Sequence, residues 1–240
     1  MLSKGKCNVC AVIVAGGQGK RFVAGYADNK KCTHKKQFVS VAGMPLLYWT
    51  ISAFQGCCII DSIVIVLPAG DIDLWAGKIM RKFNKVVGVV PGGTNRVVSV
   101  TNGLSAVPVN TGIVAIQDGV RPLVTADAVM RCVKTAARYG ACIIASPSKD
   151  TVKLVDKDGV VTQTLDRRKV WRAETPQVFK KSVILNAYAK LGTRVEVTDD
   201  AQVVELAGEK VRIIDGECLN LKVTTKEDIR IVEPLLRKRK

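Results

Sequence analysis

The chain has 240 residues, of which 48% are hydrophobic, and 37 Lys and Arg against 21 Asp and Glu give it a formal net charge of +16. This length is ordinary for one domain with a sizeable core, and no run of 18 apolar residues predicts a membrane span. We therefore expect a single domain over residues 1–240. Since no signal or transit peptide is apparent, we also expect a cytoplasmic location without membrane attachment.

The positive charge has three explanations, in decreasing order of weight: solvated surface, binding of small anionic substrates, and binding of nucleic acid. Aromatic residues make up only 5% of the chain, and no basic-aromatic motif of a nucleic-acid reader occurs. His34 is the only histidine and lies among lysines. A mechanism that depends on a histidine base is therefore disfavoured.

Apolar β-branched runs alternate with helical patterns over the first 146 residues. The runs predict strands at 10–15, 59–67, 86–90, 112–117 and 141–146, and the patterns between them predict helices at 45–54, 71–83, 95–107 and 126–139. Pro45 suits the first turn of its helix, and Thr125 or Asp127 is a candidate cap for the last one. Such an alternation predicts an α/β fold with a mostly parallel sheet, helices on both faces and ligands at the carboxyl ends of the strands.

The pattern changes after residue 148. Two alternating segments, 151–155 and 160–165, are joined by Asp-Lys-Asp-Gly and predict a β-hairpin. Because its flanks are charged, we expect this hairpin to project from the core as an arm over about 149–170. The remaining patterns predict helices at 181–191, from about 198, and at 225–236, with a strand at 211–214.

The first strand leads directly into Ala-Gly-Gly-Gln-Gly-Lys-Arg at 15–21. Glycines let backbone N–H groups approach an anion, and the two cations add charge, so this loop is typical of a nucleotide-phosphate site. It is not a Walker A loop, because Val14 and Arg21 stand where that motif needs Gly and Ser or Thr. Phe22 replaces the third glycine of a dinucleotide fingerprint.

Two later strand ends carry compatible chemistry. Gly92-Gly93-Thr94-Asn95-Arg96 opens a helix, whose N-terminus favours anions. Asp118 ends another strand and could hold Mg²⁺ against substrate phosphates, with Arg121 three residues further on. Each feature alone has a structural explanation, as a turn, a cap or surface charge. Their joint occurrence at successive strand ends favours a phosphate-handling site.

These residues resemble the 2-C-methyl-D-erythritol 4-phosphate cytidylyltransferase family over nearly the whole chain. The matching positions are Ala15-Gly16-Gly17-x-Gly19-x-Arg21, Lys36-Gln37-Phe38, Gly92-Gly93-x-x-Arg96-x-x-Ser99, Asp118-x-x-Arg121-Pro122, Asp150-Thr151-x-Lys153, Asp166-Arg167, Trp171, Thr175-Pro176-Gln177, Thr198-Asp199-Asp200-Ala201 and Asn220-Leu221-Lys222-Val223-Thr224. The resemblance implies a Rossmann-like nucleotidyltransferase fold, transfer of a cytidylyl group from CTP to the polyol phosphate, and a homodimer in which the arm completes the partner's site.

The resemblance also implies roles for individual residues. The implied catalytic residues are Arg21, Lys36 and Lys222. The implied CTP-binding residues are Ala15, Gly16, Gly17, Gly19, Gly93, Arg96, Ser99 and Gly119. The implied polyol-phosphate residues are Asp118, Arg121, Thr151, Arg167 and Thr175, with Asp118 also the implied ligand of Mg²⁺.

The chain departs from the family at several positions, and other functions remain open. The segment 22–35 is longer than usual, and Lys35 replaces the usual Pro, so Lys35 rivals Lys36 as the catalytic lysine. Leu219 replaces a common acidic residue, and Gly119-Val120 replaces two alanines. The nearest alternative function is that of the ribitol 5-phosphate cytidylyltransferases, which Asp166-Arg167 and Trp171 disfavour. A non-catalytic nucleic-acid-binding protein is the alternative from another class.

Overall fold

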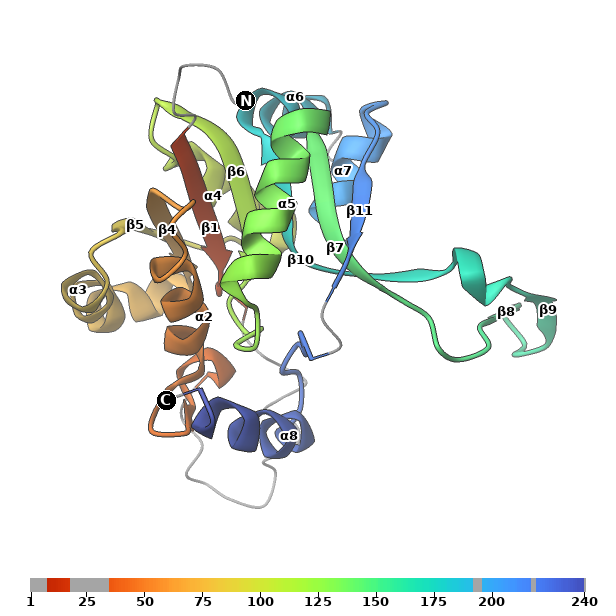
Figure 1. The fold of residues 1–240 in the computed structure, drawn as a ribbon, viewed down its shortest axis with the longest axis horizontal. Helices are drawn as coiled ribbons and strands as arrows, with labels where there is room; N and C mark the ends of the chain where they lie inside the picture. Colours follow the sequence, from red (N-terminus) through yellow and green to blue (C-terminus); the bar gives the residue numbers. More distant parts are fainter. Residues whose placement is uncertain (1–7, 18–34, 192–195, 217–218, 240) are drawn as a thin grey trace.

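The computed structural model describes residues 8–17, 35–191, 196–216 and 219–239. Their central element is a seven-stranded sheet in the order β11-β7-β10-β6-β1-β4-β5 (Figure 1). Its strands are β1 (Asn8–Val14), β4 (Ser62–Leu67), β5 (Val86–Pro91), β6 (Thr111–Asp118), β7 (Ala141–Pro147), β10 (Trp171–Lys180) and β11 (Arg212–Asp215). Neighbouring strands are parallel except where β10 pairs with β6 and β7. The predicted fold class is confirmed.

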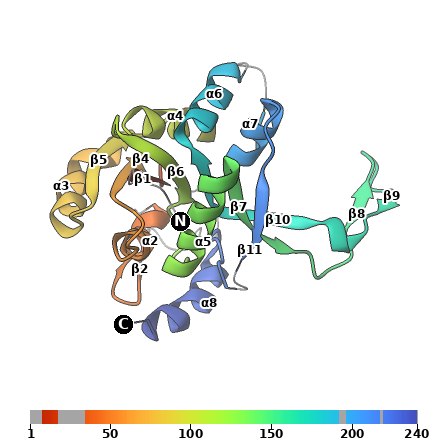
Figure 2. The ribbon, with the colours of Figure 1, turned by 45° about the horizontal axis from the view of Figure 1, so that its top comes forward.

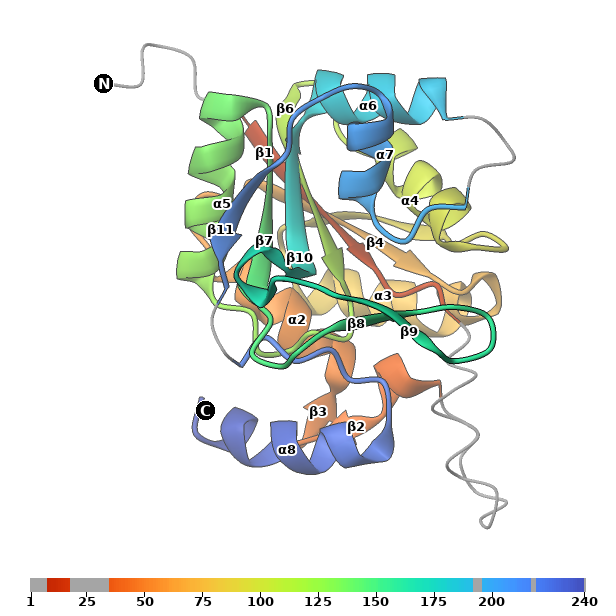
Figure 3. The same ribbon diagram turned by 90° about the vertical axis from the view of Figure 1, so that its right-hand side faces the viewer.

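Helices cover both faces of the sheet because its strands are apolar on both sides. One face packs against α2 (Leu46–Gln55), α3 (Ile72–Lys82) and α5 (Ala126–Tyr139). The other packs against α4 (Arg96–Ser105), α6 (Lys181–Lys190) and α7 (Asp200–Leu206). Figure 3 shows α5 on one side of the sheet and α4, α6 and α7 on the other. Alternate residues of β1 enter the two cores, with Ile13 in the first and Val12 in the second.

A third apolar cluster lies beyond the carboxyl ends of the parallel strands. There α8 (Lys226–Arg237) packs with the short pair β2 (Ser40–Val41) and β3 (Met44–Pro45). A capping box between Thr225 and Asp228 fixes the start of α8. This cluster holds the segment around Lys222 against the end of β6, where Val223 N donates to Val120 O.

The predicted hairpin is present as β8 (Lys153–Val155) and β9 (Val161–Thr164), which form a separate two-stranded sheet. Figures 1 and 2 show that this arm extends away from the body of the molecule. A short 3-10 helix, Arg167–Lys169, leads from the arm into β10. No helix among the described residues is long and apolar enough to cross a membrane.

Most predicted elements are present, with some shifted boundaries. The strand predicted from residue 59 begins at Ser62, because Ile60 N bonds to Cys57 O in a turn. Pro45 precedes α2 instead of lying in its first turn, and Thr125 caps α5 by accepting from Ala128 N. Strand β10 of the main sheet was not predicted from the sequence.

Candidate active site

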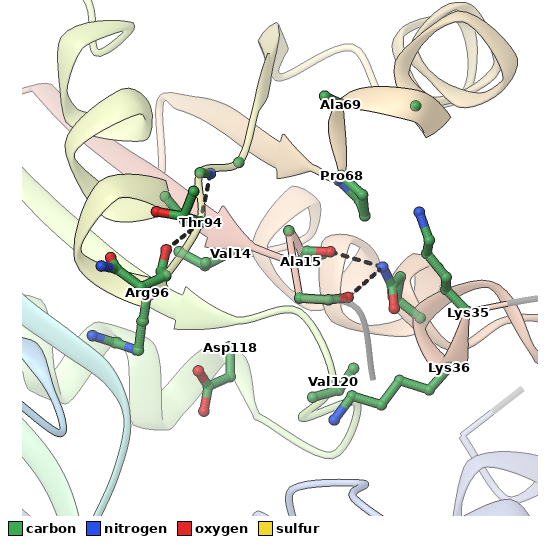
Figure 4. Close-up of a pocket in the computed structure, with 18 of the residues that line it drawn as sticks. Val14, Ala15, Lys35, Lys36, Pro68, Ala69, Thr94, Arg96, Asp118 and Val120 are labelled. Atoms are coloured by element: carbon green, nitrogen blue, oxygen red, sulfur yellow. Dashed lines mark hydrogen bonds between the residues drawn. The ribbon is translucent and has the colours of Figure 1, made fainter. Parts of the chain in front are cut away.

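A cavity of about 910 Å³ opens at the carboxyl ends of β1, β4, β5 and β6 (Figure 4). Its lining is Val14, Ala15, Gly16, Gly17, Lys35, Lys36, Gln37, Pro68, Ala69, Gly70, Gly92, Gly93, Thr94, Asn95, Arg96, Ser99, Asp118, Val120 and Lys222. The cavity therefore lies where ligands bind in parallel α/β sheets. It brings together the predicted residues of three separate strand ends.

The two glycine-rich loops of this cavity touch each other. A Cβ added to Gly92 would lie 3.0 Å from Gly16 Cα and 3.1 Å from Ser99 Oγ, and a Cβ added to Gly16 would meet Gly92 Cα at 3.1 Å. Only glycine fits this backbone contact without a shift. The contact gives the cavity a wall made largely of main chain, which suits close approach of a nucleotide.

Side-chain hydrogen bonds hold both loops. Gln37 Nε2 donates to Ala15 O at 2.9 Å and to Gly17 O at 3.3 Å (Figure 4). Ser99 Oγ accepts from Gly93 N at 3.0 Å and donates to Asn95 O at 2.8 Å. Residues 15–17 of the first loop and 92–95 of the second are thus fixed by the protein itself and are preorganised for a ligand.

Asp118 is the buried anion at the centre of a group of cations. Its Oδ2 lies 2.9 Å from Lys222 Nζ and 3.3 Å from Arg121 Nε. Burial alone raises the pKa of this carboxyl, but the charges of Lys222, Arg121 and Arg96 outweigh burial and lower the pKa below its ordinary value. Asp118 is therefore an ionised carboxylate at neutral pH.

A second, smaller cavity of about 90 Å³ adjoins the first. It is lined by Arg96, Asp118, Arg121, Ala173, Glu174, Thr175, Gln177, Thr198, Asp199 and Lys222. Arg96, Asp118 and Lys222 border both cavities. A reaction between two bound molecules would take place at this shared boundary.

Arg96 is anchored from the second half of the chain. Its Nη1 and Nη2 atoms contact the two carboxylate oxygens of Asp200 at 2.8 and 2.5 Å. Tyr188 Oη donates to Asp200 Oδ1 at 2.6 Å. Burial lowers the pKa of Arg96, but the adjacent Asp200 outweighs it and raises the pKa above the ordinary value. The guanidinium thus stays charged and faces both cavities.

The two rival lysines have different surroundings. Lys35 Nζ lies 2.7 Å from Asp71 Oδ2 at the start of α3. Lys36 Nζ donates to Val223 O at 3.2 Å, next to Lys222 in the chain. Both side chains line the large cavity. In Figure 4 the side chain of Lys36, and not that of Lys35, extends toward Asp118.

Other predicted site residues lie elsewhere. Gly119 packs behind the glycine loop, where an added Cβ would lie 2.8 Å from Ala15 Cβ, and it lines neither cavity. Thr151 and Arg167 belong to the arm and are exposed, and Arg167 Nη1 donates to Lys149 O. Gly19 and Arg21 fall outside the described residues.

Several residues that shape the site were not predicted from the sequence. Gln37, Asp199 and Asp200 lie in the family motifs, but their hydrogen bonds join segments far apart in the sequence. Gln177 Oε1 accepts from Asp200 N, and Gln177 Nε2 donates to Asp199 Oδ2. Glu174 lines the small cavity. Only its position directly before the Thr-Pro-Gln motif could have pointed to it.

The carboxylates of the site could hold a divalent cation only together with substrate oxygens. Within the described part of the chain, no three His, Cys, Asp or Glu side chains are grouped to hold a metal by themselves. Mg²⁺ commonly uses one or two carboxylates together with substrate phosphate oxygens. The ionised Asp118 carboxylate at the border of both cavities fits a cation that protein and substrate share.

A mostly parallel sheet, glycine-rich strand ends and cations between two adjoining cavities are the features of a Rossmann-like nucleotidyltransferase. The sequence profile of the 2-C-methyl-D-erythritol 4-phosphate cytidylyltransferases matches residues 9–238. The chain belongs to this family and is a cytidylyltransferase that uses CTP and 2-C-methyl-D-erythritol 4-phosphate.

Individual relatives agree with the assignment. The curated 2-C-methyl-D-erythritol 4-phosphate cytidylyltransferase of Caldanaerobacter subterraneus is 41% identical, covering 96% of this chain and all of the relative. That of Syntrophus aciditrophicus is 39% identical, covering 97% of each. The crystal structure of 4-diphosphocytidyl-2C-methyl-D-erythritol synthase from Anaerococcus prevotii has a TM-score of 0.83 and 32% identity, covering 97% of this chain and all of that one.

Proposed function

We propose that the large cavity binds CTP and that the small cavity binds the phosphate end of 2-C-methyl-D-erythritol 4-phosphate, within one catalytic domain. The observation that carries this proposal is the boundary that the cavities share, formed by Arg96, Asp118 and Lys222. The large cavity has the glycine walls that a nucleotide needs. The small cavity has Arg121 and Thr175, a cation and a hydroxyl suited to a phosphate.

The attacking group is a phosphate oxygen of the polyol phosphate, which adds to the α-phosphorus of CTP while pyrophosphate leaves. A phosphate monoester has its second pKa at about 6, so the nucleophile is already anionic at neutral pH and no general base is required. The task of the protein is to bring two anions together and to stabilise the charge at the α-phosphate. We assign this stabilisation to Arg21, Lys36 and Lys222.

Asp118 would hold Mg²⁺ together with phosphate oxygens of the nucleotide. When bound, the cation supplies positive charge that stabilises the departing pyrophosphate. In the absence of the cation, Lys222 and Arg121 already keep Asp118 ionised and oriented. The carboxylate is therefore prepared for a divalent ion without a change in its protonation state.

The arm would complete the site of a second copy of the chain in a homodimer. Val155, Val160 and Val161 on the arm are each more than half exposed, which supports a partner surface at this place. The exposed Thr151 and Arg167 line neither cavity of their own chain. They are therefore available to a neighbouring cavity. We also propose that the reaction takes place in the cytoplasm.

Pyrophosphate release tests the reaction. The protein is incubated with CTP, Mg²⁺ and either 2-C-methyl-D-erythritol 4-phosphate or ribitol 5-phosphate. We expect release with the first polyol phosphate and little with the second. Release with neither polyol phosphate would reject the proposed function. A preference for ribitol 5-phosphate would instead make the protein a ribitol 5-phosphate cytidylyltransferase.

Mixing two inactive variants tests the shared site. In a heterodimer of Lys222→Ala and Arg167→Ala chains, one site has both defects and the other has neither. After random mixing, about half of the dimers are heterodimers, and each has one intact site out of two. The mixture should therefore recover about a quarter of the wild-type activity if the arm reaches the partner's site across a two-fold axis. No recovery after subunit exchange, with a dimer present by light scattering, would mean that each chain uses its own arm or none.

A further inference from the structure

A β-bulge turns Glu174 toward the small cavity. Along β10, Ala173 pairs with Ala145 of β7, and the next paired residue is Gln177, opposite Ile143. The pairing thus skips three residues of β10 and only one of β7. In a regular strand Glu174 and Thr175 would point to opposite faces, but here both line the small cavity.

Neutral groups hold the carboxylate of Glu174. Ser146 Oγ donates to Oε1 at 2.5 Å, and Asn220 Nδ2 donates to Oε2 at 2.9 Å. The side chain is only 11% exposed, and Arg121 Nη1 approaches Oε2 no closer than 4.0 Å. Arg121 Nη1 makes its short contact, 2.7 Å, with the carbonyl oxygen of Asn220. Glu174 is therefore fixed in place without a close ion pair.

Two hydrogen bonds do not use the full capacity of a carboxylate, which accepts about four. An additional carboxylate beside a phosphate site repels the phosphate and is unfavourable for a bare anion. It is favourable when the ligand also brings hydroxyl donors, because a hydroxyl bonded to a charged acceptor forms a strong hydrogen bond. The small cavity thus has cations for a phosphate and a fixed anion for the groups next to it.

We infer that Glu174 binds a hydroxyl group of the polyol phosphate and makes the small cavity selective for phosphates that carry hydroxyls. The inference rests on the proposed function, in which that cavity holds the polyol phosphate. Arg121 and Thr175 recognise the phosphate, and Glu174 recognises the polyol. Ser146 and Asn220 are positioning residues that act through Glu174.

The Glu174→Gln variant tests this inference. Gln keeps the size of the side chain and can still bond to Ser146 and Asn220, but it lacks the charge. We expect KM for 2-C-methyl-D-erythritol 4-phosphate to rise about tenfold, the usual effect of losing a charged hydrogen bond, while KM for CTP stays unchanged. Inorganic phosphate, used as a competitor of the polyol phosphate, should inhibit as strongly as before or more strongly, because a repelling charge has been removed.

Glu205→Gln is the matched control, since it makes the same change of charge on an exposed residue of α7 and should alter neither constant. A parallel rise in KM and in the inhibition constant of phosphate would indicate a merely structural role and overturn the inference. An unchanged or lower KM would overturn it too. If the wild-type protein does not join the cytidylyl group to the polyol phosphate, the proposed function itself fails.

Ser146→Ala gives an independent test if Glu174→Gln does not fold. This variant retains the charge but removes one of the two groups that hold the carboxylate. KM for the polyol phosphate should rise severalfold, with inhibition by phosphate unchanged. A wild-type KM in Ser146→Ala would contradict the role of Glu174.

Discussion

The guanidinium of Arg96 forms a two-point ion pair with the carboxylate of Asp200, a residue 104 positions further along the chain. Arg96 begins α4 directly after the second glycine loop, and Asp200 begins α7. Asp200 is fully buried, whereas the Arg96 side chain remains 27% exposed toward the cavities. The pair thus joins the nucleotide-binding half of the sheet to the helices of the second half.

Asp200→Asn should reduce the stability of the protein. The variant leaves the guanidinium of Arg96 without its buried counter-charge. We expect the free energy of unfolding to fall by roughly 1–3 kcal/mol. This is less than for a fully buried ion pair, because Arg96 is partly exposed. Urea unfolding measures this loss. Tyr188→Phe removes only one hydrogen bond to the same carboxylate and should cost about 1 kcal/mol. Equal stability of Asp200→Asn and wild type would contradict this account.

Lys36→Ala should lower kcat about 100-fold, the usual size of the effect when one group that stabilises transition-state charge is removed. Lys35→Ala is the matched control. Its ammonium is engaged by Asp71 at 2.7 Å, so we expect only a small change in kcat. Steady-state assays of product formation compare the two. A large loss in Lys35→Ala with near-normal turnover in Lys36→Ala would exchange their roles.

Gly92→Ala should weaken CTP binding, because its Cβ would meet the backbone of Gly16 at 3.0 Å and force the two loops apart. We expect KM for CTP to increase about tenfold or more, with a smaller change in KM for the polyol phosphate. Gly77→Ala, on α3 with open space around the added Cβ, should leave KM for CTP unchanged and add up to about 1 kcal/mol of stability. Unaltered CTP binding in Gly92→Ala would show that the loop contact is not required.

The lowered pKa of Asp118 predicts a specific acid sensitivity. A carboxylate whose pKa is depressed by folding contributes stability that is complete above its ordinary pKa of 3.8 and is lost as the pH falls through the folded-state value. The free energy of unfolding of wild type should therefore decline more steeply below about pH 4 than that of Asp118→Asn. Urea unfolding at a series of pH values measures both slopes, with the exposed Asp158→Asn as control. If the free energy of unfolding of wild type and of Asp118→Asn changed with pH in parallel, the lowered pKa of Asp118 would be contradicted.

The sequence was sufficient for elements whose pattern is local. The apolar runs of β1 and β6 and the amphipathic pattern of α5 are continuous in the sequence, and each was predicted within a few residues. β10 was missed because its first six residues, Trp-Arg-Ala-Glu-Thr-Pro, are mostly polar and include a proline, features that argue against a central strand. Its place between β6 and β7 depends on partners that local patterns do not reveal.

The same distinction holds for the site. The glycine loop, Asp118 and Lys222 were predicted because each stands at a strand end or in a recognisable motif. The pairing of Arg96 with Asp200 could not be predicted, since it depends on how two distant helix starts meet. Arg21 remains a prediction from the family pattern, because it lies outside the described residues.

The strand β10 carries the end of the arm at Trp171 and the small cavity at Thr175. Strand geometry therefore restricts how the arm can change its length. If β7 and β10 each gained one residue at the base of the arm, all side chains of the arm would turn to the opposite face. Two residues added to each strand would preserve the face and carry the arm about 7 Å further out. Changes in arm length that preserve its outer surface must therefore occur in pairs of residues.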